Sequence, residues 1–405
     1  MKLKDKKIMA SVAKKLFLFF FGIILIFLFE GVAAFFLPDS KLNIAESLSV
    51  ICREDPLMFW SQRSCLKMKF YGEDVRTNNI GLRGKDFPIE KKHEVNRIIC
   101  MGASSTFGWG VAEDQTYPFL LEKIFAKNKK SALTEVLNAG QIGFTTFQGK
   151  IFLKKHILNY SPDIITVSYI LNDIDRCRFV RNEKKYDSEL TPSAAWKIIF
   201  KNIAIKSRSY LMGKRFLSKV ASKNEKFLTY VLRRQYENTK TRVSPQQYHD
   251  NLSEIAGICK AKNIKLIFLK MPVHLMRPKL TEGEEALMKN GVLLSDSFYN
   301  RACSFQARGE YSKAIADFQR ARDYQVIECQ RDGEFYQRIM SKAAREQGIV
   351  IIDIAKLFKA GNDMALLFNG PQDPIHPSGI GHEIIAKALY KSIKENNFIS
   401  GNLNR

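Results

Sequence analysis

The sequence lacks the residue patterns that mark several common classes of protein. Its seven cysteines form no Cys-x-x-Cys pair, and no His, Cys and carboxylate spacing matches a zinc or other metal site. There is neither a zinc-finger spacing nor an RNP-like aromatic motif. Only one hydrophobic stretch is long enough to cross a membrane. We therefore expect no metal, no cofactor and at most one membrane-spanning helix.

Acidic residues are scarce relative to basic ones. The 405 residues include 64 Lys and Arg but 41 Asp and Glu, a net charge of +23, and a dense positive surface is typical of nucleic-acid binding. Two segments carry most of the excess, +5 over residues 1–15 and +11 over residues 192–242, which leaves +7 for the other 339 residues. Because both segments lie beside apolar residues, we expect a membrane rather than a nucleic-acid partner.

The single long hydrophobic stretch is at the N-terminus. Residues 16–37 are apolar or small except for Glu30, and a helix of about 20 such residues spans a bilayer. The Lys-rich residues 1–15 should stay in the cytoplasm as a basic tail and place the rest of the chain outside it, in the periplasm or the extracellular space. Small residues at 32–34 leave a cleaved signal peptide as the alternative. The apolar run resumes at 35–37, which favours an uncleaved anchor.

Two cysteines lie close together just after this stretch. Cys52 and Cys65 fall in a segment that the anchor would place outside the cytoplasm, where a disulfide persists. An odd total number of cysteines favours isolated thiols instead. Both states remain open at this point.

The rest of the chain is expected to be a covering segment followed by an α/β domain. With 45% hydrophobic residues the chain can bury a large core, which excludes a disordered protein. Residues 38–95 look irregular, and residues 96–395 alternate short apolar runs with helical patterns, which predicts a parallel sheet flanked by helices. The predicted strands are residues 98–101, 135–137, 164–169, 264–269 and 349–352.

The first of two expected insertions in this domain covers residues 192–242. Between residues 196 and 236, apolar side chains recur near the helical period, and the polar positions are almost all Lys or Arg. This pattern predicts a pair of basic amphipathic helices. They either contact anionic lipid headgroups beside the anchor or form a solvated insertion packed on the domain.

The second expected insertion covers residues 286–325 and resembles a tetratricopeptide-like helical hairpin. The small and aromatic residues that carry this resemblance are Ala302, Gly309, Tyr311, Ala314, Phe318 and Ala321. A lone unit of this kind cannot bury its own face, so it should pack on the α/β domain or on a protein partner. An ordinary helical hairpin is the alternative.

Four polar segments follow predicted strands, at the edge where open α/β sheets bind their ligands. They are residues 102–108, 138–143, 171–173 and 373–378. Each alone is made of ordinary turn-forming residues. Their order along the chain, however, resembles the blocks of the SGNH or GDSL-type hydrolases over roughly residues 97–383.

This resemblance implies a flavodoxin-like three-layer α/β/α fold with a five-stranded parallel sheet. It also implies a catalytic triad in which Ser104 is the nucleophile, His376 the base and Asp373 the residue that orients the base. These residue types suit the chemistry, because a serine hydroxyl needs an adjacent base and histidine takes up and releases protons near neutral pH. Asp373 lies three residues before His376, so one turn brings the two side chains together.

The same resemblance supplies an oxyanion hole. The backbone N–H groups of Ser104 and Gly143 and the side-chain amide of Asn172 would point at the oxygen on which negative charge develops. Asp173, next to Asn172, would bond to the backbone and support this loop.

Two positions depart from the family pattern, and two neighbouring hydroxyls compete with the nucleophile. Ala103 stands where the family has Asp, and Ile170 stands where it has Gly. Ser105 and Thr106 lie further into the following helix, where a hydroxyl more often caps than attacks. His382 is expected to be a packing residue at the start of a helix.

The implied reaction is transfer of an acyl group from an ester to water or to another hydroxyl. We therefore expect a membrane-anchored serine esterase or O-acyltransferase that acts on acylated, for example acetylated, glycans or lipids of the cell envelope. A non-catalytic envelope protein that binds a glycan or a partner on the same fold is the alternative.

Overall fold

The computed structural model describes most of the chain. The described residues are 3–38, 42, 44–128, 133–175, 185–191, 193–205, 207–236, 241–273, 281–289, 294–360, 364–370, 373 and 375–399. Parts of both expected insertions, residues 192, 206, 237–240 and 290–293, lie outside this set.

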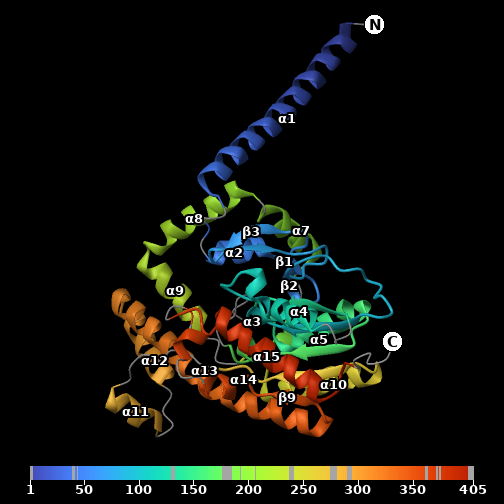
Figure 1. The fold of residues 1–405 in the computed structure, drawn as a ribbon. Helices are drawn as coiled ribbons and strands as arrows, with labels where there is room; N and C mark the ends of the chain where they lie inside the picture. Colours follow the sequence, from blue (N-terminus) through green and yellow to red (C-terminus); the bar gives the residue numbers. More distant parts are fainter. Residues whose placement is uncertain are drawn as a thin grey trace.

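A five-stranded parallel sheet forms the centre of the body (Figure 1). Its strands are β5 (Asn96–Gly102), β6 (Thr134–Gly140), β7 (Ile164–Val167), β8 (Lys265–Leu269) and β9 (Val350–Ile352). Each of the five predicted apolar runs forms one of these strands. The order is β6-β5-β7-β8-β9, the flavodoxin-like order in which the first strand lies inside the second. The central strand β7 is buried at every residue, as expected where helices cover both faces of a sheet.

Helices pack in two groups around this sheet, which confirms the three-layer α/β/α fold. α4 (Tyr117–Lys127) packs against α15 (Gly379–Glu395), whereas α10 (Pro245–Ala261) packs against α5 (Thr146–Lys155) and the long α13 (Tyr311–Gln347). The short helices are α3 (Ser104–Phe107), η2 (Glu113–Gln115), η3 (Ile157–Tyr160), α6 (Leu171–Ile174), η4 (Asp187–Glu189), α14 (Ile354–Ala360) and η5 (Met364–Leu367).

The N-terminal helix α1 (Leu3–Phe36) projects from the body (Figure 1). It begins well before the apolar stretch, so the described part of the basic tail is helical too. Residues 13–36 are long and apolar enough to cross a membrane. The C-terminal end of α1 packs against the body, because Ala33 and Leu37 are only 3% and 2% exposed.

The covering segment is irregular only in part: the described residues 77–95 form no helix or named strand, but the expectation was wrong for residues 44–76. It holds α2 (Ile44–Ile51) and two antiparallel hairpins, β1 (Cys52–Asp55) with β2 (Phe59–Gln62) and β3 (Lys67–Phe70) with β4 (Glu73–Arg76). β3, Lys-Met-Lys-Phe, alternates polar and apolar side chains, but its partner β4 and the strand β1 are mostly charged and show no such pattern.

The two cysteines of this segment are not joined. Cys52 at the start of β1 and Cys65 between the hairpins are both free thiols. Of the two states that the sequence left open, the structure contains the isolated thiols.

The basic insertion contains three helices rather than a pair. They are α7 (Ala195–Ala204), α8 (Arg208–Ser222) and α9 (Glu225–Tyr236). α8 packs against α1 and α9 against α13. The breaks fall at Ser207 and Asn224, whose side chains accept backbone N–H groups of Tyr210 and Phe227 at the starts of the following helices.

The second insertion follows α11 (Glu282–Lys289) and consists of α12 (Leu294–Ala307) packed on the first part of α13. Ala302, Ala314 and Phe318 are buried between the two helices. α13 does not end near residue 325 but continues to Gln347 and contacts α10 of the central domain. The second helix of the hairpin is therefore the first part of α13, whose later part packs in the central domain.

Candidate active site

Ser104 stands at the start of α3, directly after the first strand of the sheet. The turn between β5 and α3 lies tightly against its neighbours. A Cβ atom at Gly102 would overlap the side chains of Thr106 and Ser168, and one at Gly140 would overlap the backbone of Phe107. These two glycines therefore allow α3 to approach the sheet and present Ser104 at its carboxyl edge.

The three predicted triad residues form one chain of hydrogen bonds. Ser104 Oγ lies 2.8 Å from His376 Nε2, and His376 Nδ1 lies 2.7 Å from Asp373 Oδ1. His376 and Asp373 precede α15 and are 7% and 6% exposed, so water has little access to either. A serine hydroxyl, an imidazole and a carboxylate in this order can pass a proton from the hydroxyl to the imidazole.

The Asp373 carboxyl is kept ionised by its surroundings. Burial alone would raise its pKa, but hydrogen bonds from the His376 ring and backbone N–H and from the Asn369 amide lower it below the ordinary value. The Asn369 amide nitrogen also donates to the backbone oxygen of Trp109, at 2.7 Å. Asn369 thus ties the loop that carries the triad acid and base to the loop that follows α3.

Trp109 is stacked on the histidine of the triad. The two rings are nearly parallel, 8° apart, with their centres 4.9 Å from each other. Trp109 is 9% exposed, and Phe70 of strand β3 meets it edge to face, with ring centres 4.7 Å apart. Its backbone N–H donates to the Ser104 carbonyl at 3.1 Å. Trp109 therefore contacts both ends of the Ser104–His376 pair.

Gly143 lies in the loop after β6 with a φ of +77°, a value that favours glycine. A Cβ atom there would lie 3.0 Å from the ring of Trp60, which comes from β2 of the covering segment. The Trp60 indole N–H donates to the backbone oxygen of Ile142 at 2.8 Å. The covering segment thus packs directly against the predicted oxyanion loop.

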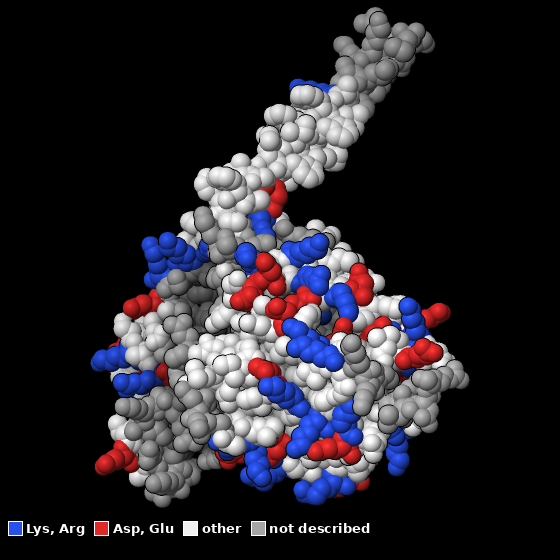
Figure 2. Space-filling view, in the orientation of Figure 1, with Lys and Arg blue, Asp and Glu red and all other residues white. Residues whose placement is uncertain are grey.

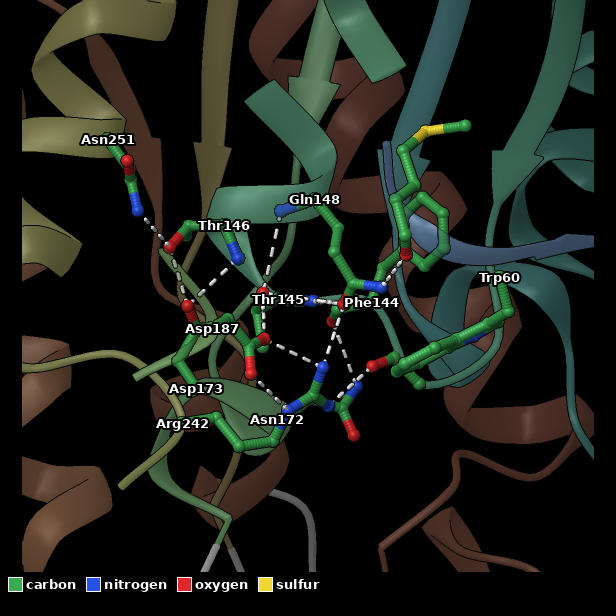
Figure 3. A network of polar contacts seen from close by, with 12 residues as sticks. Trp60, Phe144, Thr145, Thr146, Gln148, Asn172, Asp173, Asp187, Arg242 and Asn251 are labelled. Carbon is green, nitrogen blue, oxygen red and sulfur yellow. Dashed lines mark hydrogen bonds and ion pairs between the residues drawn. The ribbon is translucent and has the colours of Figure 1, made fainter. Parts of the chain in front are cut away.

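A buried arginine beside Trp60 also holds this loop (Figure 3). Arg242 donates to the backbone oxygen of Gly143 at 2.7 Å and to Gln148 Oε1 at 2.8 Å. It also forms an ion pair with Asp187 at 2.8 Å, and the two side chains are 3% and 2% exposed. The guanidinium lies over the Trp60 ring, 5.2 Å from its centre. Asp187 lies shortly before the basic insertion and Arg242 is its last residue, so this ion pair joins the chain before the insertion to its end, next to the predicted oxyanion loop.

Asn172 and Asp173 lie in the short helix after β7, and the Asn172 side chain lies beside the Arg242 guanidinium (Figure 3). Asn172 is partly exposed and donates one N–H to the backbone oxygen of Phe144 at 3.0 Å. A side-chain amide carries two N–H donors, and this hydrogen bond uses one of them. Asp173 is fully buried and accepts from the backbone N–H of Thr146 at 2.8 Å, and burial raises the pKa of its carboxyl to about 7.

The two departures from the family pattern leave this geometry intact. Ala103 precedes α3 and makes no side-chain cap, so the start of the helix has no carboxylate support. At Ile170, φ is −169°, which is outside the left-handed region that favours glycine. Isoleucine can therefore occupy this position.

Ser105, Thr106 and His382, which lie near the candidate triad in the sequence, are buried in the body. Thr106 Oγ1 bonds to Ser168 Oγ at 2.7 Å, and Ser105 is 8% exposed. His382 is completely buried on α15 and accepts the backbone N–H of Tyr117, and burial lowers its pKa to about 3. The prediction that His382 is a packing residue is confirmed.

Six residues around the site escaped the sequence analysis, among them Asn369 and Asp187. Trp60, Trp109 and Arg242 are also described above, and the sixth is Arg83, whose guanidinium donates to the backbone oxygens of Phe107, Gly108 and Val111. Arg83 thereby satisfies carbonyl groups at the end of α3. No motif marks these residues, because most of their partners are backbone oxygens. In the sequence, Arg242 is one of the many basic residues of the insertion at 192–242.

Within the described ranges, no three His, Cys, Asp or Glu side chains are placed to hold a metal ion. The arrangement of Ser104, His376 and Asp373 at the carboxyl edge of a flavodoxin-like sheet is that of an α/β serine hydrolase. The model of the GDSL-like Lipase/Acylhydrolase family matches residues 100–384 of this chain. The protein belongs to that family and is an ester-bond hydrolase.

Several solved structures are similar to this chain. A lipase/acylhydrolase from Enterococcus faecalis shares 12% identity, with a TM-score of 0.39 and coverage of 76% of this chain and 100% of that one. An acetylxylan esterase from Geobacillus stearothermophilus shares 13% identity, with a TM-score of 0.38 and coverage of 74% and 94%. A GDSL-like lipase from Bacteroides thetaiotaomicron shares 15% identity, with a TM-score of 0.36 and coverage of 76% and 93%. No curated protein matches the chain.

Proposed function

We propose that this protein is a serine esterase or O-acyltransferase, held at a membrane by α1, which removes or transfers an acyl group on envelope glycans or lipids. The observation that carries the proposal is the hydrogen-bonded chain from Ser104 through His376 to Asp373. The glycan or lipid substrate follows from the location that the anchor would impose.

The reaction begins at the Ser104 hydroxyl. His376 takes the Ser104 proton as the oxygen attacks the ester carbonyl, and it returns that proton to the departing alcohol. Asp373 holds the ring and stabilises its positive charge. A water molecule or an acceptor hydroxyl then attacks the acyl-enzyme, with His376 again as the base.

Negative charge on the carbonyl oxygen is stabilised by three donors in this proposal. They are the backbone N–H groups of Ser104 and Gly143 and the second amide N–H of Asn172. Loss of one such donor typically costs a hundred- to a thousand-fold in rate. The contacts of Trp60 and Arg242 with the Gly143 loop support its role, because donors fixed in advance need not reorganise during the reaction.

Two variants test the catalytic part of the proposal. Ser104→Ala should lower hydrolysis of p-nitrophenyl acetate by about 10⁴-fold or more and abolish labelling by a fluorophosphonate probe. Ser105→Ala removes the adjacent buried hydroxyl and should leave both readouts within about threefold of the wild type. Equal activity in Ser104→Ala and the wild type would refute the assignment of the nucleophile.

Contacts at the end of α1 favour an uncleaved anchor over a cleaved signal peptide. The Glu30 carboxylate accepts hydrogen bonds from Ser207 Oγ and from the backbone N–H groups of Arg208 and Ser209 at the start of α8. Cleavage after the small residues at 32–34 would remove Glu30 and leave these donors unpaired. Intact mass measurement of the protein from its own membranes tests this point, since loss of residues 1–34 would refute the anchor.

A further inference from the structure

Two helices of the basic insertion expose a set of large apolar side chains. α7 contributes Ile199, Phe200 and Ile203, which are 60%, 64% and 66% exposed. α8 contributes Phe216, Leu217 and Val220, which are 66%, 67% and 53% exposed. We call these six residues the α7–α8 apolar surface. Exposed apolar groups of this size mark an interaction site on a folded protein.

The two helices are fastened to the body through their other faces. On α7, the Asn202 amide accepts the backbone N–H of Glu54 at 2.8 Å and donates to its carbonyl at 3.1 Å, and Lys201 pairs with the Glu54 carboxylate at 2.9 Å. On α8, Leu211 is buried and Arg215 pairs with Glu46. The apolar surface therefore points away from the body because of specific contacts.

The position of α8 relative to α1 sets the depth of this surface. The carboxylate of Glu30, inside the apolar stretch, receives the donors of the first turn of α8. A span of about 20 residues counted from Leu16 ends near residue 35, so Glu30 lies about 8 Å inside the apolar boundary at 1.5 Å per residue. The start of α8 must lie at the same level, which is the depth reached by helices that lie in a bilayer interface.

The charge of the two helices fits the same location. Residues 195–222 contain seven Lys or Arg and no Asp or Glu. Lys and Arg side chains lie around the place where α1 joins the body (Figure 2), and α7 and α8 occupy that side (Figure 1). Amphipathic helices of this composition bind anionic membranes, because their long basic side chains reach the headgroups while the apolar face enters the lipid.

We propose that the α7–α8 apolar surface is embedded in the leaflet through which α1 leaves the bilayer, with Glu30 fixing the angle between the two. The occupant of the surface is lipid. The inference rests on the proposed anchor and goes beyond it, because it gives the catalytic domain a fixed orientation on the membrane. A single helix with a mobile connection would leave the domain free to turn.

Lipid photolabelling tests this arrangement in the full-length protein. The protein is placed in nanodiscs that contain a phospholipid with a diazirine on its acyl chain, and labelled residues are mapped by mass spectrometry. We expect label on α1 and on residues 199–220, with more label on the latter when the disc contains anionic lipid. The double variant Phe216→Glu, Leu217→Glu should lower labelling of residues 199–220 by about tenfold and leave α1 labelling and p-nitrophenyl acetate hydrolysis unchanged.

Leu133→Glu is the matched control, because Leu133 is 66% exposed on the body and belongs to neither helix. It should leave every readout unchanged. Label on α1 without label on residues 199–220 would overturn the inference and keep the anchor. Absence of label from both would refute the anchor itself. Cross-linking of residues 199–220 to a second protein copy in place of lipid would also overturn the inference.

Discussion

The Trp109–His376 stack predicts a measurable contribution to catalysis. During the attack the imidazole becomes a cation, and the face of an indole ring attracts a cation. The rings are 4.9 Å apart and nearly parallel, and both residues are more than nine-tenths buried. Cation–π contacts are worth about 0.5 to 2 kcal/mol, and the desolvated setting favours the upper half of that range. At 1.36 kcal/mol per factor of ten, loss of about 1 to 2 kcal/mol slows the reaction about 5- to 30-fold.

The perturbation is Trp109→Leu, which removes the aromatic face and keeps an apolar side chain. We expect kcat/KM for p-nitrophenyl acetate to fall by about 5- to 30-fold, mainly in kcat. The kcat/KM of Trp109→Phe should lie between the values of the wild type and Trp109→Leu, because a phenyl ring attracts a cation less strongly than an indole ring. Titration with a fluorophosphonate gives the fraction of competent sites and corrects for misfolded protein. A Trp109→Leu rate within about twofold of the wild type, after that correction, would refute the reasoning.

Three further predictions concern the residues around the triad and the oxyanion loop. Asp373→Asn should lower kcat for the same ester by about 10⁴-fold with little change in thermal midpoint, because the ring loses its carboxylate partner; a loss below about tenfold would contradict the assigned role. Arg242→Ala should lower the free energy of unfolding by about 3 to 5 kcal/mol, because it leaves the buried Asp187 carboxylate without its ion-pair partner, and Asp187→Asn added to it should recover part of that loss in thermal unfolding. Burial raises the pKa of Asp173 from 3.8 to about 7, so its contribution to stability is present below about pH 4 and is lost as the pH rises through 7. Between pH 5 and pH 8 the wild type should therefore lose more thermal stability than Asp173→Asn, and equal losses would contradict this account.

The central sheet and the triad were accessible to sequence reasoning for a physical reason. A parallel strand buried on both faces is a continuous apolar run, so Ile98–Met101 and Ile164–Val167 could be recognised without any knowledge of their neighbours. The candidate site residues lie directly after such runs or within a few residues of each other, as Asp373 and His376 do. Local sequence therefore indicated the strands of the sheet and the candidate residues that the fold brings together.

The supporting residues were not accessible in this way. Arg242 touches Gly143, which is 99 positions away, and Arg83 touches Phe107, which is 24 positions away. All three partners of Arg83 are backbone oxygens, which any residue type supplies, and the charged partner of Arg242 is Asp187, 55 positions away. Neither arrangement forms a motif in the sequence. Arg242 also lies in a stretch of exposed basic residues, where composition suggests a solvated side chain. Only its burial in the folded structure distinguishes Arg242 from these exposed basic residues.

The hairpins of residues 38–95 have a consequence for how the enzyme is divided into parts. The family match begins at residue 100, yet Trp60 and Arg83 come from before it and brace the oxyanion loop and the end of the nucleophile helix. A form of the protein without α1 should therefore begin near residue 38 rather than near residue 96. A form that begins at residue 96 would keep Ser104, Asp373 and His376. It would lose the contacts of Trp60 with the Gly143 loop and of Arg83 with the end of α3. The segment between α1 and the family domain thus holds two loops of the candidate active site in place.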